Sequence, residues 1–366
     1  MNYSIKKVEF EISNFTPIST NIINSHLLVH TDEEYETYKI TNYLGRGTVG
    51  QVYLIESNGN ICVIKISNRN LMEDLIEELE LLVTYFSENK IIHPSYPLYY
   101  GYFKNLKAVG VIYPYFGFYN LEKIKSIDYN IGFAYNIQII RQLIRQMQSF
   151  TNILHCDIKP SNVVISVRDN TIKATIIDFG LIKSVNLKDH VISTNYITSP
   201  ESLLTLSEFS TCVKSLDDFS LEKHDYYGLF SIVINLFTRK TFWTVFSQYL
   251  IDLNFNSEYL HKQNASFIFV YVWYRFTYEK KSQIKNSSLL RVIEHIEKIY
   301  PNITSKKFLN YGDFFNEYVC YYIDSYTIDK NNLEELKNFT EQIIQFDYVD
   351  RPELTKLFQH KFLSNN

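Results

Sequence analysis

The feature that most constrains the fold is a short polar motif followed further along by a second acidic motif. Residues 155–162 are His-Cys-Asp-Ile-Lys-Pro-Ser-Asn, and residues 178–180 are Asp-Phe-Gly. The first motif offers a carboxylate with a lysine and an asparagine within five positions of it, and the second offers a carboxylate two positions before a glycine. Phosphoryl transfer from a nucleoside triphosphate needs such a set, because cations and metal ions must hold the negative charge of its transition state. The spacing therefore predicts a phosphoryl-transfer site.

Regular structure is predicted on both sides of the first motif. Residues 137–154 have the apolar spacing of a buried helix that leads into the motif. Residues 162–165 and 175–177 are apolar and β-branched, and a polar turn at 168–170 separates them. This pattern predicts a hairpin that delivers Asp178 to the first motif.

A glycine-rich segment lies upstream. Residues 44–53 are Leu-Gly-Arg-Gly-Thr-Val-Gly-Gln-Val-Tyr, so three glycines stand at GxGxxG spacing. Glycines let backbone amides approach phosphates where a Cβ would block them. Dinucleotide sites share this spacing but open a helix, whereas here a turn at 57–60 predicts a hairpin into a strand at 61–66. A glycine-rich hairpin without a ligand is the alternative interpretation.

A lysine on a strand and an acidic helix follow the glycines. Cys62-Val63-Ile64-Lys65 predicts the strand, and residues 71–85 have helical periodicity. Glu78 lies on the apolar stripe of that helix, where a carboxylate needs a partner, and Lys65 is the natural one. Asp74 shares the face with a shorter side chain and is the second candidate. An ordinary surface glutamate is the competing interpretation.

Together these motifs resemble the eukaryotic-type protein kinases, with the serine/threonine branch closest. Residues 62–65 are similar to the family's Val-Ala-Ile-Lys strand, 155–162 to its catalytic loop and 178–180 to its Asp-Phe-Gly motif. The resemblance implies an α+β, two-lobed fold with a small β-rich first lobe that carries one main helix and a larger, mostly helical second lobe. It also implies ATP and Mg²⁺ as cofactors and a protein substrate with a serine or threonine hydroxyl.

The resemblance assigns catalytic roles to matching residues. Asp157 is expected to orient the substrate hydroxyl and accept its proton, and Lys159 to neutralise the transferring phosphoryl group. Lys159 stands two positions after the aspartate, as in the serine/threonine branch. Lys65 is expected to contact the α and β phosphates and to pair with Glu78.

The resemblance also assigns the metal and nucleotide sites. Asn162 and Asp178 are expected to hold magnesium. Tyr113 falls where kinases place the gatekeeper, and the hinge follows it. The residues expected to bind the nucleotide are Leu44, Gly45, Arg46, Gly47, Thr48, Val49, Gly50, Val52, Val63, Lys65, Tyr113 and Tyr115.

Structural residues of the family also have matches. Glu201, in Ser199-Pro200-Glu201, matches a glutamate that forms a buried ion pair with an arginine near the C-terminus, and Arg351 is the matching arginine. Asp225 matches the aspartate that opens the central helix and holds the catalytic loop. His155 is expected to pack in the core and tether backbone.

One departure concerns regulation. Cys156 stands where most kinases carry an arginine that pairs with an activation-loop phosphate, and a thiol cannot form that charge-assisted pair. Activity is therefore expected not to require loop phosphorylation. Thr194 matches a threonine that hydrogen-bonds the catalytic residues without any phosphate. The candidate phosphorylation sites are Ser184, Ser193, Thr194 and Tyr196.

Other departures keep alternatives open. Val63 replaces an alanine over the adenine, Pro114 removes a hinge amide, and Ser199 alters the Ala-Pro-Glu motif. These changes favour a second hypothesis, a pseudokinase scaffold that binds nucleotide or partners without turnover. A kinase of small molecules is a third, and the segment 194–201 with Arg351 argues against it.

The expected boundaries are an N-terminal extension at 1–37, a first lobe and hinge at 38–119, and a second lobe at 120–366. The second lobe contains insertions at about 205–223 and 240–340. The longer insertion is rich in aromatic residues, which predicts packed helices that extend the core.

Composition excludes several classes of protein. A net charge of −4 gives no electrostatic footprint for nucleic acid. Four cysteines without CxxC pairing indicate reduced thiols, and the apolar stretches at 228–237 and 265–273 are too short to span a bilayer. We expect a soluble, intracellular, cytoplasmic protein; no oligomeric state is predicted. Abundant tyrosine (30) and phenylalanine (26) with only 11 glycines is typical of an AT-rich genome, such as that of a large DNA virus, for which the host cytoplasm or the virion is the expected place.

Overall fold

The computed structural model describes most of the chain, and its contacts divide it into two units. The first unit comprises Met1–Gly117 with Ile177–Ile182, and the second comprises Phe118–Ile176 with Lys183–Asn366. Within the described ranges, the side chains of residues 74, 78, 88, 168 and 184 are not described. The described residues are 5–13, 22–31, 34–47, 50–67, 72–88, 93–117, 119–124, 132–150, 152–169, 171–184, 199–204, 209, 220–255, 265–323 and 328–364.

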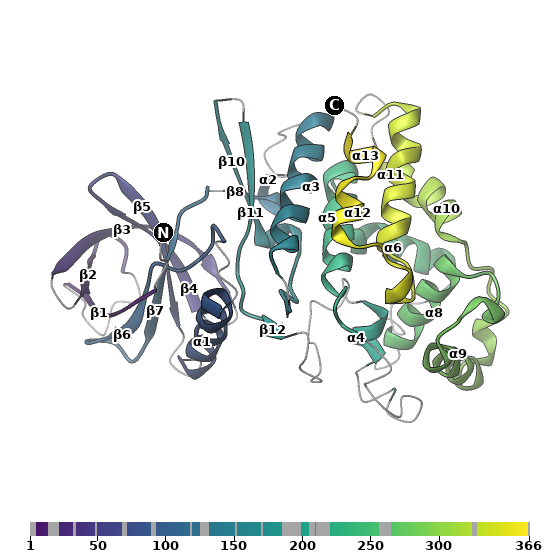
Figure 1. The fold of residues 1–366 in the computed structure, drawn as a ribbon, viewed down its shortest axis with the longest axis horizontal. Coiled ribbons are helices and arrows are strands. Elements are labelled where there is room, and N and C mark those ends of the chain that lie inside the picture. Colours follow the sequence, from purple (N-terminus) through teal and green to yellow (C-terminus); the bar gives the residue numbers. More distant parts are fainter. Residues whose placement is uncertain are drawn as a thin grey trace. The chain divides into compact units, whose positions relative to one another are not determined.

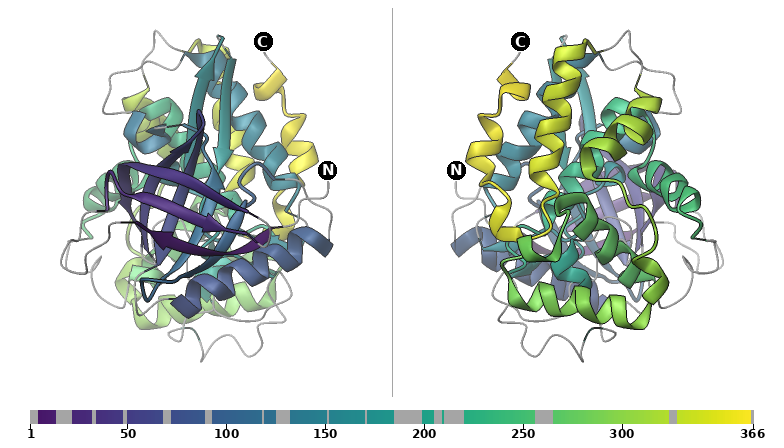
Figure 2. Two further views of the ribbon diagram at one scale, coloured as in Figure 1. Left: turned by 90° about the vertical axis from the view of Figure 1, so that its left-hand side faces the viewer. Right: turned by 90° about the vertical axis from the view of Figure 1, so that its right-hand side faces the viewer.

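The first unit is built around a closed barrel in the strand order β1-β2-β3-β4-β5-β7-β6 (Figures 1 and 2). Neighbouring strands are antiparallel except β1 and β6, which are parallel. Alternate residues of each strand point inward, so Ile40, Ile55, Ile64 and Ile112 are fully buried in the barrel core. The strands are β1 (Lys6–Ile12), β2 (His26–His30), β3 (Tyr35–Arg46), β4 (Gly50–Ser57), β5 (Asn60–Ser67), β6 (Tyr99–Phe103) and β7 (Val109–Pro114).

The hairpin predicted after the glycine-rich segment is confirmed. Strands β4 and β5 pair up to Ser57 and Asn60. Asn58 and Gly59 between them have φ angles of 50° and 79°. Positive φ at both central positions is the type I′ geometry that matches the twist of a two-residue hairpin, and it explains the Asn-Gly sequence.

One long helix, α1 (Met72–Glu88), packs on the outside of the barrel and confirms the helix predicted at 71–85. Its buried Leu75 and Leu79 form a cluster with Val109 and Val111 of β7. The alternation of β7 therefore gives one row of side chains to the barrel core and the other row to α1.

The first 37 residues differ from the predicted extension. Strands β1 and β2 lie within them, and Phe10, Leu27 and Val29 are fully buried in the barrel core. A boundary at residue 37 therefore cuts through β3 and does not separate a tail from a domain. The sequence analysis did not predict these two strands, because the resemblance to the protein kinases begins only after them.

The second unit is mostly helical (Figure 1). It also contains the predicted hairpin, which β10 and β11 form with β8 at its edge, and a short pairing of β9 with β12. Its strands are β8 (Tyr119–Asn120), β9 (Ile153–Leu154), β10 (Val163–Arg168), β11 (Thr171–Ile176) and β12 (Lys183–Ser184). Its helices are α2 (Leu121–Ile124), α3 (Phe133–Gln148), α4 (Pro200–Leu204), α5 (Asp225–Thr238), α6 (Phe242–Asp252), α8 (Ala265–Thr277), α9 (Ser287–Ile299), α10 (Tyr311–Phe314), α11 (Lys330–Ile343), α12 (Leu354–Phe358) and α13 (Lys361–Ser364). Shorter turns of helix are η2 (Pro160–Asn162), η5 (Lys281–Gln283), η6 (Pro301–Ile303), η7 (Phe315–Val319), η8 (Cys320–Tyr322) and η9 (Tyr348–Asp350).

Two glutamines of α3 anchor the hairpin. Gln142 donates to the carbonyl of Ile172 at 2.9 Å and accepts from the amide of Ala174 at 2.9 Å. Gln146 repeats the pattern one helical turn later, with the carbonyl of Ala174 at 2.8 Å and the amide of Ile176 at 2.9 Å. The two amides thus satisfy the open edge of β11 as a neighbouring strand would, which fixes the hairpin that leads to Asp178.

The aromatic insertion forms packed helices, as predicted. Helices α6, α8, α9, α10 and α11 occupy the range 240–340 apart from the residues that are not described. At their centre Trp273 stacks against Phe246 and Phe242, with ring centroids 5.7 and 5.6 Å apart. Among the described residues, no helix combines the length and the apolar character needed to cross a membrane.

Candidate active site

The glycine-rich turn joins β3 to β4 in the first unit. The amide of Gly47 donates to the carbonyl of Gly50 at 2.9 Å, while Thr48 and Val49 lie outside the described residues. At Gly50 a Cβ would collide with the carbonyl of Ile66, so packing against β5 requires this glycine. At Gly45 a Cβ would meet nothing within 4 Å, and at Gly47 its nearest neighbour would be 3.9 Å away. The first two glycines of the motif therefore leave room that no part of the described chain fills.

The predicted nucleotide-binding side chains share one face of the barrel wall. Strand pairing aligns Gly45 with Val52, Val52 with Lys65, and Val63 with Tyr113. Residues paired in this way, and residues two apart on one strand, project from the same side of a sheet. That side is the outer one, since the intervening Ile64 faces the barrel core. Leu44 and Arg46 lie on β3 and Tyr115 follows β7; Leu44 and Tyr115 are partly exposed and Arg46 is exposed.

The lysine and the second predicted carboxylate meet on this unit. Lys65 Nζ lies 3.2 Å from Asp178 Oδ1, with the lysine side chain 11% exposed and the aspartate side chain 44% exposed. Asp178 has a φ of 64°, in the left-handed region that costs free energy for a residue with a Cβ. An almost buried cation beside a half-exposed carboxylate is an arrangement that can hold anionic phosphates and a metal ion.

Phe179 fixes the backbone after this carboxylate. Its ring is 3% exposed and contacts Phe86 of α1 and His93 edge-on, at centroid distances of 5.8 and 5.2 Å. This packing holds the strained conformation of Asp178 in place. Glu78, the predicted partner of Lys65, belongs to α1, but its side chain lies outside the described residues, as does that of Asp74.

In the second unit the catalytic-loop residues form one cluster. Lys159 Nζ lies 2.7 Å from Asp157 Oδ2. Asn162 Nδ2 donates to the same oxygen at 2.8 Å and to the carbonyl of Asp157 at 2.9 Å. The structure therefore brings together the carboxylate, the ammonium and the amide of the three residues that the sequence analysis singled out in this loop.

The buried side chain of Asp225 anchors the backbone of this loop. Asp225 Oδ2 accepts from the amide of His155 at 2.7 Å, and its Oδ1 accepts from the amide of Cys156 at 2.9 Å. His155 is fully buried, and its Nδ1 accepts from the amide of Asp157 at 3.3 Å. At Gly228, one turn along α5, a Cβ would meet Ile158 Cβ at 2.6 Å, so the helix can approach the loop only with a glycine there.

Cys156 is a neutral, buried thiol. It is 2% exposed and has a φ of 62°. Burial first and the nearby Asp225 carboxylate second raise the pKa of the thiol far above its ordinary value. The side chain is therefore neither a nucleophile nor a cation at neutral pH.

Glu201 and Arg351 form the predicted buried ion pair. Arg351 Nη2 donates to Glu201 Oε1 at 2.7 Å and to Oε2 at 2.9 Å, and the two side chains are 1% exposed or less. Burial alone would lower the pKa of Arg351, but the facing carboxylate outweighs it and the pKa is raised. The guanidinium also lies over the ring of Tyr227 at 4.9 Å.

Ser199, which departs from the family motif, has its own partner beside this pair. Its Oγ lies 3.1 Å from His224 Nδ1 and accepts from the amide of Ser202 at 3.3 Å. Both side chains are almost fully buried. A serine and a histidine that satisfy each other explain why this position is not alanine, and sequence reasoning missed the pairing because nothing marks His224 as its partner.

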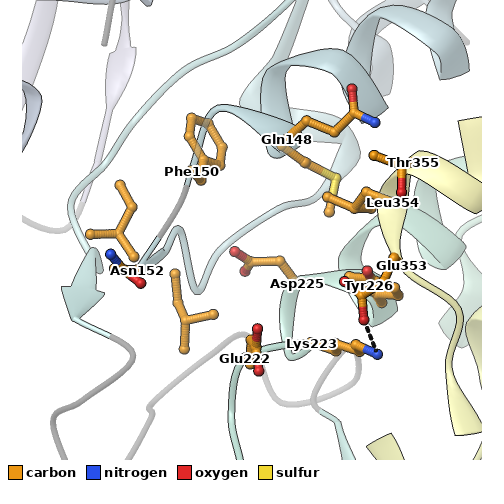
Figure 3. Close-up of a pocket in the computed structure, with 13 residues that line it drawn as sticks. Gln148, Phe150, Asn152, Glu222, Lys223, Asp225, Tyr226, Glu353, Leu354 and Thr355 are labelled. Carbon is orange, nitrogen blue, oxygen red and sulfur yellow. Dashed lines mark ion pairs between the residues drawn. The ribbon is translucent and has the colours of Figure 1, made fainter. Parts of the chain in front are cut away.

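A cavity of about 340 Å³ in the second unit borders the loop anchor (Figure 3). The end of α3, residues 152–154, the start of α5 and the start of α12 line it. Asp225 points into it, and Lys223 and Glu353 on its wall form an ion pair of 2.8 Å. Among the residues to which the sequence analysis gave a role, only Asp225, at the start of α5, lines this cavity. The cavity therefore does not belong to the predicted nucleotide face.

Comparisons with known proteins agree with the motifs. Residues 38–363 match the sequence model of the family described as protein kinase domain. An Aurora kinase of Saccharomyces cerevisiae is 30% identical over 156 residues, covering 40% of this chain and 40% of the relative. An Aurora kinase of Eremothecium gossypii is 29% identical over 154 residues, covering 39% of each chain. Mitogen-activated protein kinase kinase kinase 3 of Arabidopsis thaliana is 24% identical over 231 residues, 58% of this chain and 34% of the relative. The alignments thus span well under half the length of these curated relatives.

Removing the buried arginine should destabilise the second unit. Arg351→Ala leaves the Glu201 carboxylate buried without its cation, which should cost about 3–5 kcal/mol of unfolding free energy. Denaturant unfolding measures the loss, with Arg291→Ala, an exposed arginine on α9, as the matched control. An unfolding free energy unchanged by Arg351→Ala would contradict the pairing.

The burial of His224 beside Ser199 should make stability depend on pH. Burial lowers the pKa of His224 below the 6.5 of a free histidine, and Arg351 adds to this effect although Asp225 opposes it. As the pH falls, His224 of the unfolded chain therefore binds a proton before His224 of the folded chain does. The contribution of this histidine to stability is complete above pH 6.5 and is lost as the pH drops through the folded-state pKa. His224→Asn, which can keep a neutral hydrogen bond, should flatten this fall.

The measurement is unfolding free energy between pH 5 and 8, where ordinary histidines titrate. Ser199→Ala is the control, because it removes the hydrogen bond but leaves the titrating ring. It should lower stability at every pH and keep the slope. Parallel curves for wild type and His224→Asn would overturn the assignment.

Proposed function

Because the chain belongs to the protein kinase family, we propose that it transfers the γ-phosphoryl group of ATP to a serine or threonine hydroxyl of a protein substrate. The observation that carries this proposal is the Lys65–Asp178 pair of 3.2 Å beside two glycines whose space the described residues leave open. The family's two-lobed, mixed helix and strand fold agrees with the division of the chain into two units.

The first unit fits a nucleotide. The side chains of Val52, Val63 and Tyr113 project from the face that carries Lys65, and they offer apolar surface for an adenine. Gly45 and Gly47 let backbone amides approach phosphates, and the Lys65 ammonium would neutralise the α and β phosphates. Val63 in place of alanine narrows the roof of this face and should weaken ATP affinity without preventing binding.

Each unit also offers an oxygen ligand of the kind that magnesium uses. Asp178 offers a carboxylate, and its side chain is 44% exposed. Asn162 donates a hydrogen bond from Nδ2 to Asp157 and offers its amide oxygen to the metal. Among the described residues no group of three or more His, Cys, Asp and Glu side chains could hold a metal. Magnesium uses one or two protein oxygens together with phosphates and water. When bound, the ion would neutralise charge on the phosphates.

The second unit would supply the proton transfer. Asp157 would accept the hydroxyl proton of the substrate, and its own orientation is held by Asn162 and Lys159. The Lys159 ammonium, 2.7 Å from this carboxylate, would also neutralise the phosphoryl group as it moves. A lysine at this position supports serine and threonine as acceptors.

Loss of either carboxylate should abolish transfer. Asp157→Asn should lower the rate by about 10²–10⁴-fold, because it removes a general base, and Asp178→Asn should lower it comparably by removing the metal ligand. Transfer of labelled phosphate from MgATP to the protein itself and to a basic serine/threonine peptide measures this.

Asp169→Asn is the matched control. Asp169 lies exposed on the β10–β11 turn with a φ of 49°, which asparagine tolerates, so this variant should keep the wild-type rate. Absence of label in the wild type, while ATP still raises the melting temperature, would favour the pseudokinase alternative instead.

Activity should not depend on phosphorylation of the activation loop. The neutral thiol of Cys156 offers no cation to a phosphate, so treatment with a phosphatase should leave the rate unchanged. Ala at Ser184, Ser193 or Thr194, or Phe at Tyr196, tests single sites; all four side chains lie outside the described residues. Loss of activity both on phosphatase treatment and in one of these variants would sink the idea. Loss in Thr194→Ala alone would not, because this threonine is expected to act unphosphorylated.

A further inference from the structure

The N-terminal segment that precedes the family match is built into the first unit. The match begins at Tyr38, within β3, whereas β1 and β2 lie before it. Strand β2 pairs with β3, and β1 pairs with both β2 and β6. These two strands join the ends of an otherwise open sheet, so the barrel described above closes only through residues outside the family match.

The contact of β1 with β6 is unusually close. Val8 and Gly101 are partners in the parallel register, and a Cβ on Gly101 would collide with the carbonyl of Val8. Phe10 contacts Phe103 with ring centroids 5.2 Å apart, and both rings would crowd a Cβ on Gly110. The glycines of β6 and β7 are thus fitted to the presence of β1.

Hydrogen bonds extend this contact beyond the strand ends. The carbonyl of Phe10 accepts from the amide of Lys104 at 2.8 Å. Asn105 Nδ2 donates to the carbonyl of Ile12 at 2.7 Å, and its Oδ1 accepts from the amide of Ile12 at 3.3 Å. The first two residues of the turn between β6 and β7 are therefore tied to β1.

The same segment also packs against a hydrophobic cluster that contains residues of α1. Ile5, just before β1, packs against the cluster formed by Leu75 and Leu79 of α1 with Val109 and Val111 of β7. Val111 is the register partner of Lys65. One short stretch of chain thus closes the sheet between β3 and β6 and packs against the cluster that joins α1 to β7, the strand paired with that of Lys65.

We propose that residues 5–13 and 22–30 form a positioning element of the ATP site, which holds α1 and β7 against the strand of Lys65. The proposal rests on the proposed function for its effect on ATP, but its effect on α1 is independent of that function. The segment closes the β6 edge, so this edge is not open to strand addition by another protein.

Gly101→Ala in the full chain tests the brace, because the added methyl group should displace β1 and leave the residues that would bind ATP unchanged. Backbone amides of α1 should exchange with solvent at least ~10-fold faster, while those of α5 in the second unit keep their rates. The KM for ATP should rise more than kcat falls. Gly132→Ala, where a Cβ would meet nothing within 4 Å, is the control.

Ile5→Ala is the second variant, in case Gly101→Ala does not fold. This substitution removes only the packing of Ile5 against the cluster of α1 and β7 residues described above. Its matched control is Ile61→Ala, since Ile61 is 42% exposed on β5. Faster exchange confined to α1 and β7 would support the proposal. A lower melting temperature with unchanged α1 exchange and unchanged KM would overturn it and leave a purely structural role. If the wild type transferred no phosphate, the proposed function would fail, and the exchange comparison would still decide whether the segment positions α1.

Discussion

The catalytic loop depends on one buried carboxylate. Asp225 accepts the amides of His155 and Cys156, which fixes the backbone immediately before Asp157. Cys156 holds a left-handed φ of 62°, a conformation that costs a residue with a Cβ about 1–3 kcal/mol unless its surroundings enforce it. The close approach of α5 at Gly228 supplies that enforcement from the next turn of the same helix. The start of α5 thus sets the geometry of the loop. This geometry does not depend on the arginine that most kinases carry at the position of Cys156.

The departures from the family pattern divide into two kinds. Ser199 and His224 satisfy each other beside the Glu201–Arg351 pair, so the change at one position is matched by the other. A chain that had lost its function would be expected to carry such changes without compensation, which leaves buried polar groups unpaired and costs free energy of folding. Cys156 has no such compensation for charge, and we expect its consequence to be confined to regulation. The altered residues therefore give little support to a protein that has lost its chemistry.

Much of the site could be predicted because its chemistry is local in sequence. The cluster of Asp157, Lys159 and Asn162 lies within one loop, and register alone carries Lys65 to the face of Gly45. The unpredicted parts join residues far apart in the chain. Gln142 and Gln146 hydrogen-bond along the open edge of β11, and β1 pairs with β6, whose residues lie 93 positions further along the chain. A single amide or a five-residue strand gives no periodic signal, so only the folded chain reveals these contacts.

Glycine offers a final test of the assignment, because a chain with only 11 of them uses each sparingly. A glycine destabilises a strand unless its missing Cβ is needed. Gly50 and Gly101 are needed because another strand's carbonyl occupies the space of a Cβ, and Gly59 is needed for its φ of 79°. Gly45 and Gly47 meet neither requirement. Two glycines that no described part of the chain requires, on the face of a nearly buried lysine, are best explained by a ligand that approaches the backbone there.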